Sequence, residues 1–216
     1  AKPNLMVTDP PYGVEYDPTR RTGAARTGLV ENDDRYDWRD TYTLFSGDVV
    51  YVWCASIGYA TVLQNLRDCD FTDRAFLVWA KPTHAMTPYG RNAEQVARWG
   101  LYHWQHEACW YAVRGETVNW IGGLAQSTVW EIDHKNTGDD QTSHGTQKPL
   151  ECMARPIRNH EGDVYEPFAG SGTTLVACQN LNRKCYAIEI SESYCAVILQ
   201  RMKDAFPELL IERIDG

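Results

Sequence analysis

The sequence predicts an α/β fold in which a doubly wound, mostly parallel sheet is covered by helices on both faces. Short runs rich in Val, Ile and Tyr alternate along the chain with segments of helical periodicity, and this alternation is typical of parallel sheets. The chain has 216 residues, of which 43% are hydrophobic, so it is long enough to bury a sizeable core. We therefore expect a single domain over residues 1–216.

Seven apolar runs predict strands because they are short and rich in Val, Ile and Tyr; they span residues 5–8, 49–54, 75–79, 108–113, 128–132, 164–168 and 185–190. Helical patterns lie between them, at 60–66, about 92–99, about 150–158 after a proline, 173–181 after a glycine turn, and 191–205, which Ser191 caps. The segments that resemble loops are 14–35, 115–126 and 134–146. In an open sheet, loops beyond the carboxyl ends of the strands carry function.

The composition excludes several classes of protein. No apolar run approaches the roughly 18 residues that a membrane helix needs, and the hydrophobic content is too high for a disordered chain. Seven widely spaced cysteines without a Cys-x-x-Cys pair predict neither a disulfide framework nor a zinc site, and they fit a reducing cytoplasm. The chain starts at Ala1 without a Met or a secretory leader, as an excised or processed piece would.

Net charge argues against a polyanionic partner. The chain has 29 acidic and 21 basic residues, a net charge of −8, whereas binding to phosphates needs clustered Lys and Arg. The local charge differs, because Arg20, Arg21 and Arg26 lie in a Thr/Gly-rich loop with no acid between them. These arginines are candidates for DNA phosphate contacts; the alternative is that they only solvate a loop.

A strand, a glycine turn and a helix follow one another over residues 164–174, VYEPFAGSGTT. Backbone amides at such a turn can approach a ligand closely. Glu189 comes nineteen residues after Gly170, near the spacing at which a carboxylate holds ribose hydroxyls. The pattern predicts a nucleoside-cofactor site. The missing Lys after the second glycine disfavours a P-loop, and Leu175 disfavours a nicotinamide site. The alternative is a structural turn beside a surface Glu.

A second motif, Asp9-Pro10-Pro11-Tyr12, directly follows the strand predicted at 5–8. The prolines fix the backbone and hold the residue before each of them extended. An exocyclic aromatic amine suits this turn, because its two N–H groups can donate to the Asp9 carboxylate and the Pro10 carbonyl while Tyr12 stacks on the ring. The alternative is a rigid turn without chemistry.

Together the two motifs resemble those of the DNA amino-methyltransferases, which use S-adenosylmethionine. Asp-Pro-Pro-Tyr comes before Phe168-Ala169-Gly170-Ser171-Gly172 in this chain, which is similar to the circularly permuted motif order of the beta group of that family. The segment His144-Gly145-Thr146-Gln147-Lys148-Pro149 also resembles the group's segment before the glycine motif. The resemblance covers about residues 4–205 and implies the Rossmann-like fold of S-adenosylmethionine-dependent methyltransferases.

The resemblance also implies roles for the matched residues. The catalytic set would be Asp9, Pro10, Pro11 and Tyr12. The cofactor-binding set would be Asp9, Thr146, Gln147 and Lys148 near the methionine end, Phe168, Ala169, Gly170, Ser171, Gly172 and Thr173 at the turn, Glu189 at the ribose and Ile190 at the adenine. The target base would be flipped out of the DNA duplex. Neither a cysteine nucleophile nor a metal is implied.

The resemblance favours adenine N(6) over cytosine N(4), because cytosine enzymes of the family more often carry Ser in place of Asp9. A short target-recognition insertion is expected at about 114–127, where Trp120 is a candidate for base stacking on DNA. This insertion is short, and the family's usual upstream strand and Gly-Asp segment are missing. With the acidic net charge, these features predict dependence on a flanking domain or a partner subunit, and the resemblance implies a homodimer as a further alternative. The remaining alternative is a non-catalytic DNA-binding subunit of the same fold.

Overall fold

A computed structural model describes residues 2–13, 30–82, 105–116, 118–133 and 147–214. In these ranges the chain forms one sheet in the order β5-β3-β4-β2-β1-β6-β7. Its strands are β1 (Leu5–Thr8), β2 (Val49–Cys54), β3 (Thr72–Ala80), β4 (His106–Val113), β5 (Val129–Glu131), β6 (Val164–Glu166) and β7 (Cys185–Ala187). The helices are α1 (Arg39–Tyr42), α2 (Tyr59–Asp68), α4 (Leu150–Asn159), α5 (Thr173–Asn180) and α6 (Glu192–Ala205). The helix expected at 92–99 lies outside the described residues.

The sheet is mostly parallel, as predicted. Strand β1 is parallel to β2 on one side and to β6 on the other, β6 is parallel to β7, and β3 is parallel to β5. Strand β4 is the exception, because it is antiparallel to both β2 and β3. The start of β4 therefore lies at the same edge of the sheet as the carboxyl ends of its neighbours, and its end lies at the opposite edge.

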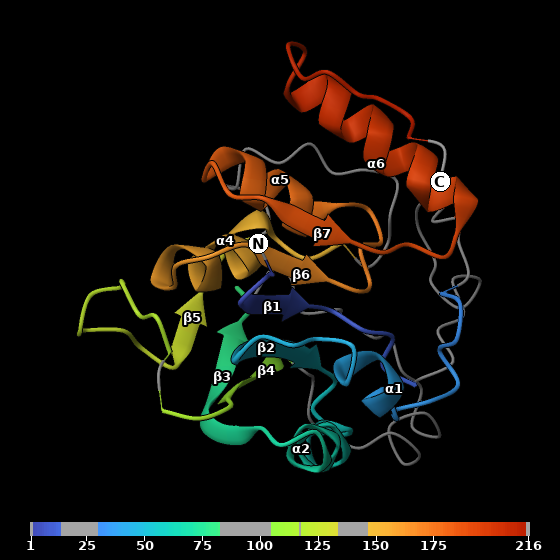
Figure 1. Cartoon of the computed structure of the whole chain (residues 1–216). Helices are drawn as coiled ribbons and strands as arrows, with labels where there is room; N and C mark the ends of the chain where they lie inside the picture. The colour runs from blue at the N-terminus through green and yellow to red at the C-terminus, as the bar shows by residue number, and fades with distance from the viewer. Residues whose placement is uncertain (1, 14–29, 83–104, 117, 134–146, 215–216) are drawn as a thin grey trace.

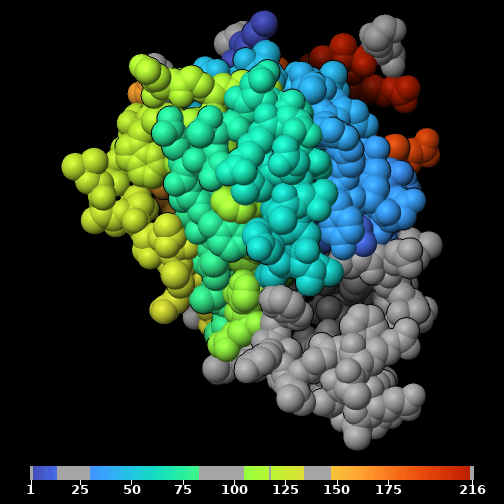
Figure 2. Space-filling view, turned by 90° about the horizontal axis from the view of Figure 1, so that it is seen from below, coloured from blue at the N-terminus to red at the C-terminus, as the bar shows by residue number. Residues whose placement is uncertain are grey.

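Helices cover both faces of the sheet, as Figure 1 shows. Leu5 and Val7 of β1 belong to the core that includes buried residues of α4 and α5, whereas Met6 belongs to the core under α1 and α2. This alternation is the period of two that an extended strand imposes on its side chains. Helix α6 packs on α5 in a third, smaller cluster that includes Ile198 and Met202. Figure 2 shows the face of the molecule on which α2 and β3 lie.

The main differences from the expected elements are at the ends of the sheet strands. The chain leaves the sheet earlier than expected at β6 and β7, because Pro167 cannot donate to the ladder and residues 168–172 form the glycine turn. The short helix α1 was not predicted; its four residues are too few for a helical period to show. No helix in the described ranges is long and apolar enough to cross a membrane.

Candidate active site

The two predicted motifs leave the sheet side by side. Leu5 pairs with Val164 and Met6 with Tyr165 in parallel register, so the turn after β1 and the turn after β6 lie at the same edge. Since β1 and β6 are neighbours whose connections run to opposite sides of the sheet, this edge is a switch point, where open α/β sheets place their ligands. The expectation that both motifs contribute to one site is therefore supported by the strand order.

Glu166, at the end of β6, links the two turns. Its side chain is 1% exposed. One carboxylate oxygen accepts from the Thr8 hydroxyl at 2.5 Å and from the Phe168 N–H at 3.0 Å, and the other accepts from the Thr174 hydroxyl at 2.6 Å. Burial raises the pKa of Glu166 to about 8, against the lowering effect of these three donors. Sequence analysis did not assign a role to this residue.

Asp9 stands in a hydrogen-bonded network at the mouth of the site. The Tyr12 hydroxyl donates to Asp9 Oδ1 at 2.7 Å. Lys148 Nζ donates to both Asp9 oxygens at 2.9 Å and to the Tyr12 oxygen at 2.6 Å. The same ammonium lies 2.7 Å from Glu107 Oε2, and Lys81 forms a second ion pair with Glu107. Asp9, Tyr12 and Lys148 were predicted site residues, whereas Lys81 and Glu107 were not.

The pKa values of this network follow from burial and from its alternating charges. Burial raises the pKa of Asp9 above its ordinary value, and Lys148 opposes that rise. Burial also acts to raise the pKa of Glu107, but Lys148 and Lys81 together bring it down to about 2. The pKa of Lys148 is raised, because the two carboxylates outweigh the effect of burial. The network therefore places the Lys148 ammonium between the carboxyl groups of Asp9 and Glu107, where it opposes the rise in the pKa of Asp9 and lowers that of Glu107.

Two aromatic residues in the segment 30–38 hold the turn that follows β1. The Trp38 indole N–H donates to the Pro11 carbonyl at 3.2 Å, and its ring meets the Phe168 ring edge-on, with the centroids 4.6 Å apart. The Tyr36 ring lies between Gly13 and Gly58, where a Cβ on either glycine would come within 2.7 Å of it. A hollow beside the turn is lined by Pro10, Pro11, Tyr12, Tyr36, Trp38, Trp53, Cys54, Ala55, Gly58 and Val62. The turn after β1 and the turn after β6 are thus joined through Trp38.

Trp38→Phe tests this contact. The variant keeps an aromatic ring but loses the donor to Pro11 and part of the buried indole, so we expect the free energy of unfolding to fall by about 1–3 kcal/mol and kcat to fall because the turn loses a restraint. Chemical denaturation and initial rates measure the two effects. Trp130→Phe is the matched control, since the buried Trp130 of β5 loses an equivalent bond of 2.9 Å to the Ser127 carbonyl. We expect Trp130→Phe to lose stability but keep its rate. If Trp38→Phe also loses stability without losing rate, the positioning role of Trp38 is contradicted.

The turn after β6 has the geometry of a ligand cradle. Gly170 and Gly172 have φ values of 52° and 82°, in the region that favours glycine. The Gly170 N–H donates to Glu189 Oε2 at 2.7 Å, and the Ser191 N–H donates to Glu189 Oε1 at 2.9 Å. Glu189 is only half-buried, so its oxygens keep lone pairs for a further donor. The space where a Gly170 side chain would lie is open.

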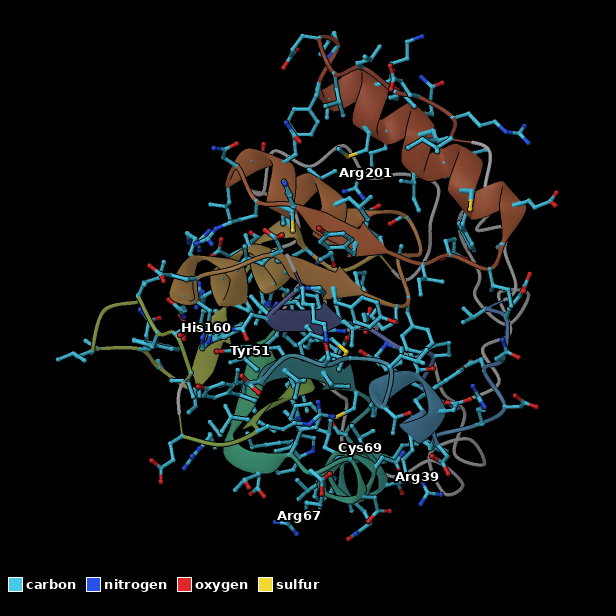
Figure 3. All side chains as sticks on the ribbon, in the orientation of Figure 1. Arg39, Tyr51, Arg67, Cys69, His160 and Arg201 are labelled. Carbon is cyan, nitrogen blue, oxygen red and sulfur yellow. The ribbon has the colours of Figure 1, made fainter. Side chains whose placement is uncertain are left out.

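Arg201 of α6 supports this turn from behind (Figure 3). Its guanidinium donates to the Ser171 carbonyl at 2.9 Å, to the Ser171 hydroxyl at 3.3 Å and to the Thr173 hydroxyl at 3.1 Å. Ser171 and Thr173 are buried, so their side chains serve the shape of the turn. Phe168 and Gly170 are partly exposed, and Ile190 is 72% exposed beside Glu189. A buried Arg on a later helix leaves no local signal in the sequence.

The expected recognition insertion lies at the other edge of the sheet. Trp120 pairs with His160 in an antiparallel bridge and meets its ring edge-on at 5.1 Å. His160 also forms a hydrogen bond with the Tyr51 hydroxyl at 2.9 Å, and Figure 3 shows these two residues away from Arg39, the first residue of α1. This placement follows from the direction of β4, whose end lies at that edge. Trp120 therefore does not share the site with Asp9.

Several predicted residues lie outside the described ranges, namely Arg20, Arg21, Arg26 and Thr146. Gln147 is described and stands next to Lys148, half-buried. Within the described ranges, no group of three or more His, Cys, Asp or Glu side chains could hold a metal ion.

Comparison with known proteins decides the family. A family model described as DNA methylase matches residues 4–200 of this chain. The chain belongs to the DNA methylase family. A member with a similar sequence is the type II methyltransferase M.HpaI of Haemophilus parainfluenzae, which is 36% identical over 94 residues. That match covers 42% of this chain and 30% of M.HpaI, so this methylase chain matches less than a third of its relative.

Solved structures of methyltransferases share the fold. The M1.HpyAVI–SAM complex superposes with a TM-score of 0.67 at 22% identity, over 93% of this chain and 89% of that one. The cytosine-N4-specific PvuII DNA methyltransferase superposes with a TM-score of 0.63 at 16% identity, over 93% of this chain and 79% of that one. The predicted fold class, a Rossmann-like, mostly parallel sheet of the methyltransferase type, is confirmed.

Proposed function

We propose that this chain is the catalytic domain of a DNA methyltransferase that uses S-adenosylmethionine to methylate the exocyclic N(6) amine of adenine. The observation that carries the proposal is the position of the Asp9 carboxylate. It stands at the carboxyl edge of β1, partly exposed, beside the glycine turn of β6 and joined to that turn through Glu166 and Trp38. Membership of the DNA methylase family supports methyl transfer to DNA, and the choice of adenine rests on the resemblance of the turn at Asp9.

The residues of the glycine turn fit the proposed cofactor. Gly170 leaves open space at the turn, Glu189 has acceptor capacity for ribose hydroxyls, and Ile188 and Ile190 expose apolar surface beside it. When bound, S-adenosylmethionine supplies an electrophilic methyl group. Phe168 would lie against the cofactor, and Gln147 stands near the catalytic network.

The turn at residues 9–12 binds and activates the target amine. The lone pair of this amine is delocalised into the base, so its nitrogen is a weak nucleophile. Donation of its two N–H groups to Asp9 Oδ2 and to the Pro10 carbonyl favours a tetrahedral nitrogen and frees the lone pair. As the nitrogen gains a methyl group it gives up one proton, which the Asp9 carboxylate accepts, because burial has raised its pKa. The ring of Tyr12 stacks on the flipped base, and Arg20, Arg21 and Arg26 are the proposed phosphate contacts.

Cytosine N(4) is the second candidate target. Its exocyclic amine has the same two donors as that of adenine, the matched family model covers both N6 and N4 enzymes, and one of the structures with this fold is a cytosine-N4-specific enzyme. Asp9 favours adenine, by the resemblance of its turn to the adenine enzymes. The type II relatives favour a role in restriction–modification, and an activity that depends on a flanking domain or partner subunit is part of the proposal.

Nucleoside mass spectrometry tests the function directly. Unmethylated DNA is incubated with the protein and S-adenosylmethionine, digested and analysed, with Asp9→Ala as the control. We expect N(6)-methyladenine from the wild type and, after the same incubation time, far less of it from the variant. N(4)-methylcytosine would overturn the choice of base and keep the mechanism. No methylated base, with the cofactor still bound, would contradict the catalytic proposal and favour a non-catalytic DNA-binding subunit.

A further inference from the structure

We propose that Lys148 is a positioning residue that keeps the Asp9 carboxylate ionised and aimed at the target amine, and that Glu107 limits this effect by sharing the same ammonium. The inference rests on the proposed function, because it assigns both residues a part in the same methyl transfer. Sequence resemblance had placed Lys148 near the methionine end of the cofactor, whereas its contacts in the structure are with Asp9, Tyr12 and Glu107.

The contacts of Lys148 use all of its hydrogen-bonding capacity. The side chain is 5% exposed. An ammonium has three N–H donors, and Nζ has three sets of partners within 2.9 Å: the two Asp9 oxygens, the Tyr12 oxygen and Glu107 Oε2. The ammonium is therefore fixed in place, and no donor remains for the carboxylate of a cofactor unless one of these contacts is broken.

The same contacts determine which oxygen of Asp9 is available. Oδ1 accepts from both the Tyr12 hydroxyl and Lys148, whereas Oδ2 accepts from Lys148 alone among the described hydrogen bonds. Each carboxylate oxygen has about two lone-pair sites. Oδ2 therefore keeps one acceptor site, and the side chain of Asp9 is 21% exposed, which leaves that site accessible to a substrate.

Asp9 needs a cation because burial and the charge of Glu107 favour its neutral form, whereas Lys148 and the hydrogen bond from Tyr12 favour its ionised form. Among the described residues, the charged or titratable groups that face it are Lys148, Glu107, Tyr12, Glu166, Cys54, Cys109 and Cys152. Burial and Glu107 raise the pKa of Asp9, and Lys148 opposes them. A protonated Asp9 would present a donor where the amine needs an acceptor. Within the described ranges, Lys148 is the cation that hydrogen bonds to Asp9.

Glu107 reaches this network because β4 runs antiparallel and starts at the catalytic edge. It binds Lys148 and Lys81, and its own charge acts on Asp9 in the direction opposite to that of Lys148. Removal of Lys148 and removal of Glu107 should therefore shift the titration of Asp9 in opposite directions. A role that is only structural gives no reason for such a pair of opposite shifts.

The pH dependence of kcat tests this pair. For Lys148→Met, the acid limb of the profile is expected to move upward by about one to three pH units, the effect of an opposite charge within hydrogen-bonding distance. For Glu107→Gln, we expect the limb to move downward. Lys203→Met, which removes the same charge from an exposed position on α6, is the control and should leave the limb in place. If Lys148→Met does not fold, Glu107→Gln alone tests the proposal: a downward shift of the acid limb supports it, and an upward shift or no shift contradicts it.

A double-mutant cycle tests whether Lys148 acts through Asp9. In an Asp9→Asn background, adding Lys148→Met should change kcat by less than about threefold, because the group it positions is already lost. If Lys148→Met lowers kcat by the same factor in the Asp9→Asn background as in the wild type, Lys148 does not act through Asp9 and the proposal is overturned. The proposal is also overturned if Lys148→Met binds the cofactor more weakly and leaves the acid limb in place, because Lys148 then belongs to the cofactor site.

A measurement without turnover separates this inference from the proposed function. The carboxyl carbon of Asp9 is titrated by nuclear magnetic resonance in the wild type, Lys148→Met and Glu107→Gln, and its signal is assigned by its loss in Asp9→Asn. We expect a higher pKa of Asp9 without Lys148 and a lower one without Glu107. If the wild type methylates no DNA, the proposed function fails, and this titration still decides the role of Lys148; equal pKa values in all three proteins would refute it.

Discussion

Asp9→Ala is expected to lower kcat for methyl transfer by about 10²–10³-fold, the usual cost of removing one preorganised polar group at the reacting atom. The variant loses the acceptor for one N–H of the target amine and the group that takes its proton. The Pro10 carbonyl remains, so some alignment of the amine survives. Rates of methyl transfer from labelled S-adenosylmethionine to unmethylated duplex DNA measure the effect.

The same variant is expected to stay folded. Lys148 keeps its ion pair with Glu107 at 2.7 Å and its bond to the Tyr12 oxygen, so no buried charge is left without a partner. Asp204→Ala, an exposed substitution on α6, is the matched control and should retain the wild-type rate. If Asp9→Ala stays within about threefold of wild type, Asp9 is not the acceptor on which the proposed mechanism depends.

The parts of the site that could be predicted from the sequence are those with local causes. The prolines after Asp9 and the glycines after Phe168 fix their own turns, and each turn follows an apolar run that predicts a strand. The parallel order of β1 and β6 then brings the turns together. Both motifs were therefore recognisable before any long-range contact was known.

The residues that sequence analysis missed depend on long-range geometry. Glu107 contributes to the site because β4 is antiparallel to β2 and β3, whereas the alternation of strand and helix patterns, including the helix expected at about 92–99, predicts parallel strands. For the same reason the segment after β4 lies at the far edge with Trp120. Arg201 reaches the glycine turn only because α6 packs on α5. None of these placements has a signature within ten residues of the side chain concerned.

Glu166 connects the turn after β1 with the turn after β6, and its protonation is expected to make the stability of the protein depend on pH. Its pKa is about 8 in the folded protein because burial outweighs three donors, against an ordinary value of about 4.3 in an unfolded chain. Between these two values the unfolded state releases a proton that the folded state retains. The stabilising contribution is therefore complete below pH 4 and is lost as the pH rises to 8, at about 1.4 kcal/mol for each pH unit.

Glu166→Gln should remove this dependence, because Gln does not ionise. Its amide oxygen can accept from Thr8 and the Phe168 N–H, and its amide nitrogen can donate to the Thr174 hydroxyl, which turns to accept. We expect the free energy of unfolding of wild type, relative to that of the variant, to fall steadily between pH 5 and pH 8 in chemical denaturation. Glu161→Gln, an equal change of charge at an exposed position, should show no such slope. If the difference in free energy of unfolding between wild type and Glu166→Gln does not change between pH 5 and pH 8, Glu166 is already ionised in the folded protein over this range. The contact between the two turns would then be made by a charged carboxylate.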